Sequence, residues 1–229
     1  MGKRKGPLSG IRILDLTLLY PGPLATMMLA DMGADVVRLE HPSRPDLVHL
    51  LPPFVGNESA AYLSLNRSKR SLALDTGKEE GRKVFFDLVK TADLVVEQFR
   101  PGVLDRIGIG YKEAVRFNPR IIYLSITGFG QDGPYRRKPG HDINYMGLAG
   151  LLSQMKKGKE MTVPGFQTAD VAGGAYLSII ACMAGLWHRE KTGKGQVVDT
   201  SLMGSVIAAL AFVLAPACIL GKEFPREIR

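Results

Sequence analysis

Little in this sequence points to a disulfide or a metal site. Its two cysteines, Cys182 and Cys218, both lie in apolar stretches, as small buried hydrophobic residues of a reducing compartment do. No C-x-x-C, H-E-x-x-H or other metal-ligand spacing is present. The basic N-terminus is not followed by an apolar stretch, so it does not resemble a signal peptide. We therefore expect a cytoplasmic protein without a metal site.

Aromatic residues are also few, at 7% of the chain. The net charge of +8 favours anionic partners, but nucleic acid is not expected because no binding module or aromatic interleaving is present. One uncharged apolar run, Leu202–Leu220, is long enough to span a bilayer. Asp199 to Ser201 ahead of it form a helix cap, and basic anchors are nearly absent at its ends. We expect a buried helix there, at a subunit interface, and no membrane insertion.

Strands and helices alternate through most of the chain. Ile11–Thr17 and Ala34–Glu40 have the pattern of strands on either side of a helix, Leu24–Met32, which Gly33 ends. Such a unit implies a parallel sheet with a right-handed crossover. The other expected elements are strands at Asp93–Glu97, Ile121–Thr127 and Gln196–Asp199 and helices at Lys78–Thr91, Val171–Arg189 and Ser201–Leu220.

This order of elements predicts an α/β fold with a Rossmann-like, doubly wound parallel sheet followed by apolar helices. We assign residues 1–200 to a large ligand-binding domain. Residues 201–229 are expected to hold an apolar helix and the start of a linker.

The stretch Ser125–Gly147 carries the strongest functional signals. Gly128, Gly130 and Gly133 follow a strand and match the G-x-G-x-x-G pattern of dinucleotide-binding proteins. Pro134 comes directly after the last glycine, and no helix opens there, so the context does not fit a nicotinamide cofactor. We expect this glycine loop to enclose a different ligand.

His141 and Asp170 are the candidate catalytic residues. His141 lies in a Gly/Pro-rich loop beside Asp142, and Asp170 stands where an apolar helix begins, with two glycines behind it. We predict that His141 and Asp170 face each other across a substrate carbon. The alternatives are structural: a histidine that holds its loop together and an aspartate that caps a helix N-terminus.

Basic residues supply the candidate phosphate ligands. Arg38 and Arg100 each follow a strand, at the carboxyl edge where such sheets bind ligands. The densest basic cluster is Asn66–Arg70. A second cluster, Arg136–Lys138, either binds phosphate or is simply a basic face exposed to solvent.

Several segments between Pro7 and Leu202 run in an order shared with a known family. They are GIRILDLT, GPLATMMLADMGADVVRLEHP, LNRSKRSLALD, EQFRPGVLDRIGIGY, PRIIYLSITGFGQDGPY, GHDINY, TADVAGG and HREKTGKGQVVDTSL. Together they resemble the family III CoA transferases (CaiB/BaiF) and, within them, the α-methylacyl-CoA racemases. His141 in GHDINY favours the racemase branch, because transferases commonly place a tyrosine or another residue there.

The resemblance implies an epimerase that inverts the α-carbon of 2-methylacyl-CoA thioesters. His141 and Asp170 would exchange protons with that carbon through an enolate, and backbone amides, including that of Asp142, would hold the enolate oxygen. Aspartate ordinarily titrates near about 3.9 and histidine near about 6.5, so burial would have to raise the pKa of the aspartate.

The resemblance also implies how coenzyme A binds, as part of the substrate and with no prosthetic group. Arg38 and Arg100 would hold the CoA phosphates. The other binding residues would be Asn66, Arg67 and Arg70 near the adenosine and Gly128, Gly130, Gln131 and Gly133 along the pantetheine and thioester.

Two alternatives to the racemase remain open. A CoA transferase would use Asp170 as a nucleophile and pass through anhydride and thioester intermediates. An inactive fragment would bind CoA without exchange or transfer. Family members are longer, add a smaller domain and form interlocked homodimers with active sites at the dimer interface. We expect the same homodimer for a full-length chain and place the end of the present sequence near the first linker.

Overall fold

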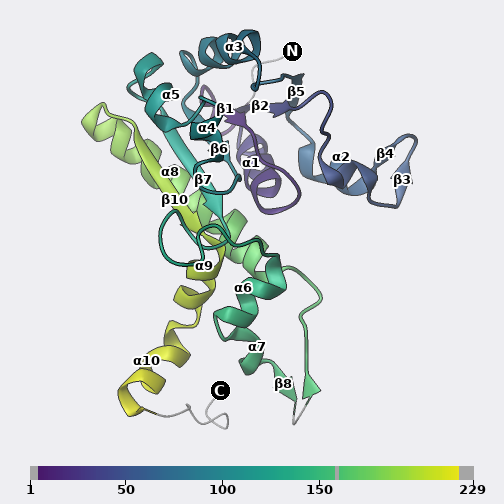
Figure 1. Cartoon of the computed structure of the whole chain (residues 1–229), viewed down its shortest axis with the longest axis vertical. Coiled ribbons are helices and arrows are strands. Elements are labelled where there is room, and N and C mark those ends of the chain that lie inside the picture. The colour runs from purple at the N-terminus through teal and green to yellow at the C-terminus, as the bar shows by residue number, and fades with distance from the viewer. Residues whose placement is uncertain (1–4, 158–159, 222–229) are drawn as a thin grey trace.

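A six-stranded parallel sheet forms the body of the protein in the computed structural model, which describes residues 5–157 and 160–221 (Figure 1). The strands lie in the order β10-β7-β6-β1-β2-β5. In chain order this is the 3-2-1-4-5-6 arrangement of doubly wound nucleotide-binding folds. The predicted fold class is confirmed. The strands are β1 (Arg12–Asp15), β2 (Asp35–Glu40), β5 (Arg70–Ala73), β6 (Leu94–Glu97), β7 (Ile122–Thr127) and β10 (Gln196–Ser201).

Helices cover both faces of the sheet because its strands are apolar on both sides. Successive side chains of a strand point to opposite faces. Thus Val36 packs in one core with α1 (Pro21–Asp31) and α8 (Leu177–Thr192), whereas Val37 packs in the other with α3 (Glu79–Val89). The second core also contains residues of α4 (Val103–Arg106) and α5 (Tyr111–Phe117).

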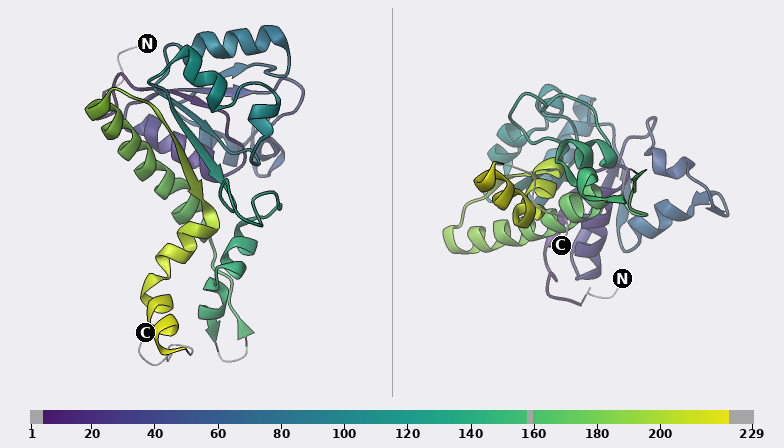
Figure 2. Two further views of the ribbon diagram at one scale, coloured as in Figure 1. Left: turned by 60° about the vertical axis from the view of Figure 1, so that its left-hand side comes forward. Right: turned by 90° about the horizontal axis from the view of Figure 1, so that it is seen from below.

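A smaller group of elements extends away from the carboxyl end of the sheet (Figures 1 and 2). It consists of α6 (Asp142–Leu148), α7 (Leu151–Gln154), the hairpin β8 (Lys156–Lys157) and β9 (Glu160–Met161), and the helices α9 (Leu202–Ala209) and α10 (Ala211–Leu220). On another side lie η1 (Leu47–Leu50), the hairpin β3 (Phe54–Val55) and β4 (Glu58–Ser59), and α2 (Ala60–Asn66).

The helix expected at Val171–Arg189 begins two residues earlier, at Ala169, and its first part is a π-helix. Residues Ala169–Tyr176 make a π-helical segment, η2, which continues directly into α8. Its glycines allow close packing: a Cβ at Gly174 would lie 2.5 Å from Pro21, and one at Gly173 would lie 3.0 Å from the carbonyl oxygen of Leu202. The segment therefore packs tightly between α1 and α9.

The expected helix Ser201–Leu220 is two helices that meet at a 70° bend. Ser201 caps α9 through its Oγ, which accepts the Gly204 N–H at 3.1 Å. Leu210, at the break, is buried in the core, whereas Phe212 beyond it is 75% exposed. The structure therefore contradicts the prediction of one continuous helix, whereas its burial at a subunit interface stays a prediction. Residues 222–229 of the predicted terminal segment lie outside the described residues.

Among the residues that the structure describes, one continuous helical run, Ala169–Thr192, is long and apolar enough to cross a membrane, and 39% of its apolar 18-residue stretch is buried inside the protein. The helices α9 and α10 are long and apolar enough to cross a membrane only if the bent pair is counted as one span. Core helices of globular proteins share these properties, so the absence of membrane insertion stays a prediction.

Candidate active site

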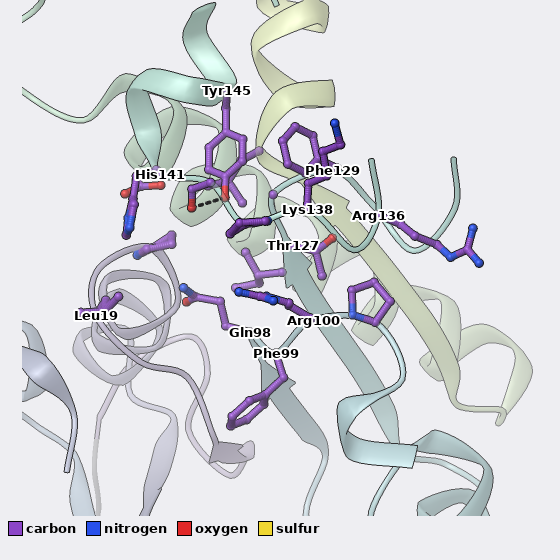
Figure 3. Close-up of a pocket in the computed structure, with 18 residues that line it drawn as sticks. Leu19, Gln98, Phe99, Arg100, Thr127, Phe129, Arg136, Lys138, His141 and Tyr145 are labelled. Carbon is purple, nitrogen blue, oxygen red and sulfur yellow. Dashed lines mark hydrogen bonds between the residues drawn. The ribbon is translucent and has the colours of Figure 1, made fainter. Parts of the chain in front are cut away.

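A cavity of about 270 Å³ opens at the carboxyl ends of β1, β6 and β7 (Figure 3). Leu19 and Pro21 line it after β1, Gln98–Pro101 after β6, and Ile126–Phe129 at the end of β7. The chain order of the strands reverses between β1 and β6, so the loops that follow them diverge and leave a crevice. The sheet topology thus decides where this cavity opens.

The structure brings His141 and Asp170 to this one cavity. Both residues also line a second cavity of about 410 Å³, together with Asp142 and Phe166. In Figure 3, His141 lies above Leu19 on the left-hand side of the view, with Phe129 toward the right. The two candidate catalytic residues therefore share a space in which a small group could lie between them.

His141 is held by the first turn of α6. Its backbone N–H donates to Oδ1 of Asn144 at 2.9 Å, and its carbonyl oxygen accepts the Asn144 N–H at 2.8 Å. Tyr145 donates through its hydroxyl to the carbonyl oxygen of Gly140 at 2.7 Å (Figure 3). The Tyr145 ring also lies so close to Gly128 that a Cβ there would collide with it. These contacts explain why glycine occurs on both sides of the ring.

Asp170 is the second residue of η2, whereas Thr168 takes the N-cap position. The N-cap alternative therefore does not describe Asp170. Its backbone N–H donates to Oδ1 of Asp142 at 2.9 Å. Burial, and then the charge of Asp142, raise the pKa of the Asp170 carboxyl to about 7. Such a group exchanges protons readily at neutral pH.

Cationic side chains surround the cavity. Arg100, Arg136 and Lys138 line it, although Arg136 points away from the other labelled residues in Figure 3. Arg100 also lines an open cavity of about 560 Å³ with Arg106 and Arg137. The sequence analysis did not single out Arg106, because a lone arginine within the turn of α4 carries no motif.

Arg38 has a different place from the one expected for a phosphate ligand. Its side chain is 1% exposed and faces three carboxylates. The Arg38 guanidinium lies 2.6 Å from Asp46, 3.3 Å from Glu40 and 3.9 Å from Asp15. The strand end is at the expected edge of the sheet, but the side chain turns into the protein.

The cluster Asn66–Arg70 does not line the cavity that holds His141 and Asp170. Arg67 pairs with Asp31, and Arg70 pairs with Asp35 at 2.7 Å. The Asn66 side chain accepts a hydrogen bond from Lys69 at 2.9 Å. Arg67 thus links the end of α2 to α1, and Arg70 links β5 to β2.

Of the glycine loop, Gly128 lines the cavity. Gly130 and Gly133 have φ values of +87° and +86°, which glycine adopts without strain. Gln131 donates its backbone N–H to Asp199 at 3.0 Å and lines a separate cavity of about 200 Å³ beside Glu97. Among the described residues, no group of three or more His, Cys, Asp or Glu side chains is arranged to hold a metal ion.

Comparison with known proteins identifies the family. The model described as CoA-transferase family III matches residues 8–228, which is nearly the whole sequence. The chain belongs to this family. The resemblance seen in the sequence motifs is therefore confirmed, including the likeness to a racemase.

Transferases and a racemase are similar to this chain to the same degree. It is 40% identical over 222 residues to the succinyl-CoA:glutarate CoA-transferase of Homo sapiens, covering 96% of this chain and 50% of that protein. It is 39% identical over 221 residues to the alpha-methylacyl-CoA racemase of Homo sapiens, covering 96% and 54%. The chain thus spans about half the length of the curated relatives it matches.

A solved structure confirms the fold. The crystal structure of a CAIB/BAIF family protein from Brucella suis superimposes with a TM-score of 0.90 at 34% identity, covering 97% of this chain and 60% of that one. The family III chain described here therefore corresponds to the large, sheet-containing part of such proteins.

Proposed function

We propose that this family III chain carries the catalytic residues of an acyl-CoA racemase that inverts the α-carbon of 2-methylacyl-CoA thioesters. The supporting observation is that His141 and Asp170 line one cavity while the pKa of Asp170 is raised to about 7. A histidine and such a carboxyl group can each give or take a proton at neutral pH. A two-base inversion needs this pair of groups.

In the proposed reaction, one residue removes the α-proton and the electron pair moves onto the thioester oxygen. The other residue then delivers a proton to the opposite face of the carbon, which inverts it. The backbone N–H of Asp142, at the first position of α6, is the proposed donor to the enolate oxygen.

The CoA moiety would extend from this cavity over the loop that follows β6. Arg100 lines both the catalytic cavity and the open cavity with Arg106 and Arg137. Three guanidinium groups around one opening suit the phosphates of CoA. Gly128 would let the pantetheine pass close to the backbone. Asn66, Arg67 and Arg70 remain proposed neighbours of the adenosine.

A CoA transferase is the second candidate, supported by the 40% identity to a transferase. The Asp170 carboxylate would attack the thioester carbonyl, the C–S bond would break, and CoA thiolate would leave a mixed anhydride. The thiolate would then attack the Asp170 carbonyl, which breaks the anhydride C–O bond, releases the first carboxylate and leaves an Asp170–CoA thioester. The acceptor carboxylate would attack this thioester to form a second anhydride, and the thiolate set free would attack the acyl carbonyl of that anhydride to give the new acyl-CoA and free Asp170. A third possibility is a chain that binds CoA without either reaction.

The homodimer is part of the same proposal. Large apolar side chains on α8 and α10 are exposed in the single chain: Trp187 is 65% exposed and Phe212 is 75% exposed. We expect a second full-length copy to cover them, and sedimentation equilibrium of the full-length protein tests this.

Deuterium exchange distinguishes the three possibilities. The full-length protein is incubated in D2O with each epimer of a 2-methylacyl-CoA, and α-deuterium and configuration are followed. We expect His141→Ala and Asp170→Ala each to abolish inversion, and exposed His188→Ala on α8 to leave it unchanged.

Inversion that survives in either catalytic variant would rule out the two-base mechanism. An acyl or CoA adduct on Asp170, detected by mass spectrometry with a donor acyl-CoA, would establish the transferase. Binding of CoA with neither reaction would establish the inactive form.

A further inference from the structure

A buried ion pair stands behind one wall of the candidate active site. Arg38 on β2 and Asp46 before η1 are 1% and 3% exposed. The Arg38 guanidinium donates to Oδ2 of Asp46 at 2.6 Å. The same carboxylate accepts the backbone N–H of Leu19, at 2.9 Å from Oδ2 and 3.1 Å from Oδ1. It also accepts the N–H of Val48 at 3.1 Å.

Leu19 has an unusual backbone conformation. Its φ is +58°, in the left-handed region that a residue with a Cβ rarely adopts. Such a conformation persists only where the surroundings determine it. Leu19 (Figure 3) lines the cavity together with Pro21, His141 and Asp170. The strained residue is thus a residue of the site.

The other carboxylates around Arg38 have different partners. Asp15 accepts hydrogen bonds from Lys69 at 3.0 Å and from Thr26 at 2.6 Å, within the core. Glu40 accepts from Tyr62 at 3.0 Å. Asp15 also accepts the backbone N–H of Thr17 in the loop after β1, at 2.9 Å. Of the three carboxylates, Asp46 is the one that accepts the N–H of Leu19. The three carboxylates compensate the charge of the Arg38 guanidinium. The guanidinium therefore positions its neighbours and does not bind a phosphate.

We propose that Arg38 and Asp46 are positioning residues whose ion pair holds Leu19 in its left-handed conformation. The ion pair thereby fixes the apolar wall against which an acyl-CoA substrate lies. The part concerning the substrate rests on the proposed function, whereas the hold on the Leu19 backbone does not.

A thermodynamic cycle on the full-length protein tests the hold without any ligand. The variants are Asp46→Asn, Leu19→Gly and their combination, and chemical unfolding is measured for each. Asparagine keeps an acceptor but loses the charge that pairs with Arg38. We expect Asp46→Asn to raise the unfolding equilibrium constant about tenfold in the wild-type background. In the Leu19→Gly background the effect should be at least about threefold smaller, because glycine adopts positive φ unaided.

The matched control is Glu113→Gln, which breaks an exposed ion pair with Arg116 on α5. Its effect should be the same in both backgrounds. Equal effects of Asp46→Asn in the two backgrounds would contradict the proposal that the ion pair holds Leu19 in its left-handed conformation.

If Asp46→Asn does not fold, a second comparison tests whether Leu19 is held in a strained conformation. Leu19→Gly and Leu19→Ala remove the same side chain, but only alanine retains the strain at positive φ. We expect Leu19→Gly to unfold at the higher denaturant concentration, although glycine is normally the less stable of the two. An alanine variant that is at least as stable would contradict the proposal.

The substrate part is measured by calorimetry with a 2-methylacyl-CoA and with free CoA. We expect Asp46→Asn to weaken acyl-CoA binding about fivefold more than CoA binding. Equal weakening of both ligands, or none, would overturn this part. If wild-type protein binds neither ligand, the proposed function fails, while the unfolding cycle still decides the hold on Leu19.

Discussion

The backbone N–H of Asp170 donates a hydrogen bond of 2.9 Å to the carboxylate of Asp142. This contact joins α6 to η2 across 28 residues of sequence. It also sets two acidic side chains beside one cavity. The same carboxylate thus positions the candidate catalytic residue and, through its charge, helps to raise the pKa of that residue.

Asp142→Asn is expected to lower the pKa of Asp170. Asparagine still accepts the Asp170 N–H but carries no charge, so the repulsion between the two carboxylates disappears. The pKa should remain above the ordinary value of 3.8, because burial is the larger cause of the shift. Carbon-13 NMR titration of labelled aspartate measures it. An unchanged pKa would show that Asp142 exerts no electrostatic effect.

Asp170→Asn is expected to stabilise the protein at high pH. The carboxyl has a folded pKa of about 7 against 3.8 for the ordinary group. The folded protein therefore keeps a proton that the unfolded chain has released, and this stability is full below pH 4 and lost as the pH rises through 7. The variant should gain about 1–2 kcal/mol over wild type at pH 8.5 and nothing at pH 4, because the group is only partly buried. Denaturant unfolding at the two pH values measures this.

Glu97→Gln, at a different position, is also expected to stabilise the protein at high pH. Burial raises the pKa of Glu97 to about 7, from an ordinary 4.5, and the nearby Asp105 and Asp199 add to the shift. Glutamine keeps an acceptor for the Phe99 N–H, which lies 2.7 Å away. Stability of the wild type should fall relative to the variant between about pH 4.5 and 7, by up to about 3 kcal/mol. Parallel pH profiles of the two proteins would contradict this assignment.

Gly140→Ala is expected to displace Tyr145 and the loop that carries His141. A Cβ at this position would lie 2.7 Å from the Tyr145 ring. Overpacking of this kind costs about 1–3 kcal/mol of unfolding free energy. The control is Gly165→Ala, because a Cβ there meets nothing within 4 Å. Equal stability of the two variants would show that the ring moves aside freely.

Local sequence patterns predicted most strands of the sheet and the helices α1 and α3 close to their observed bounds, but not how the segments beyond the sheet bend. The strand expected at Ile121–Thr127 is β7 (Ile122–Thr127), since an apolar β-branched run between turns has one stable place. The helix expected at Ser201–Leu220 bends at Leu210. No local sequence pattern predicted this bend. Packing of Leu210 into the core decides that break.

The same division applies to the candidate site. Arg38 was expected to follow its strand, but it lies inside β2, and three carboxylates enclose its side chain. A pattern of residues does not show which way a side chain turns. That His141 and Asp170 face each other was predicted from the glycine-rich loop and the helix start in which they lie, and their shared cavity depends on how α6 and η2 pack.

The amino-acid sequence by itself determined the alternation of strands and helices, the glycines of the loop after β7 and the family to which the chain belongs. These features depend on local periodicity, backbone freedom and motif order. Only the tertiary structure decided the burial of Arg38, the left-handed Leu19 and the raised pKa of Asp170. Each of these depends on residues distant in sequence, because burial and charge are set by whatever packs around a group.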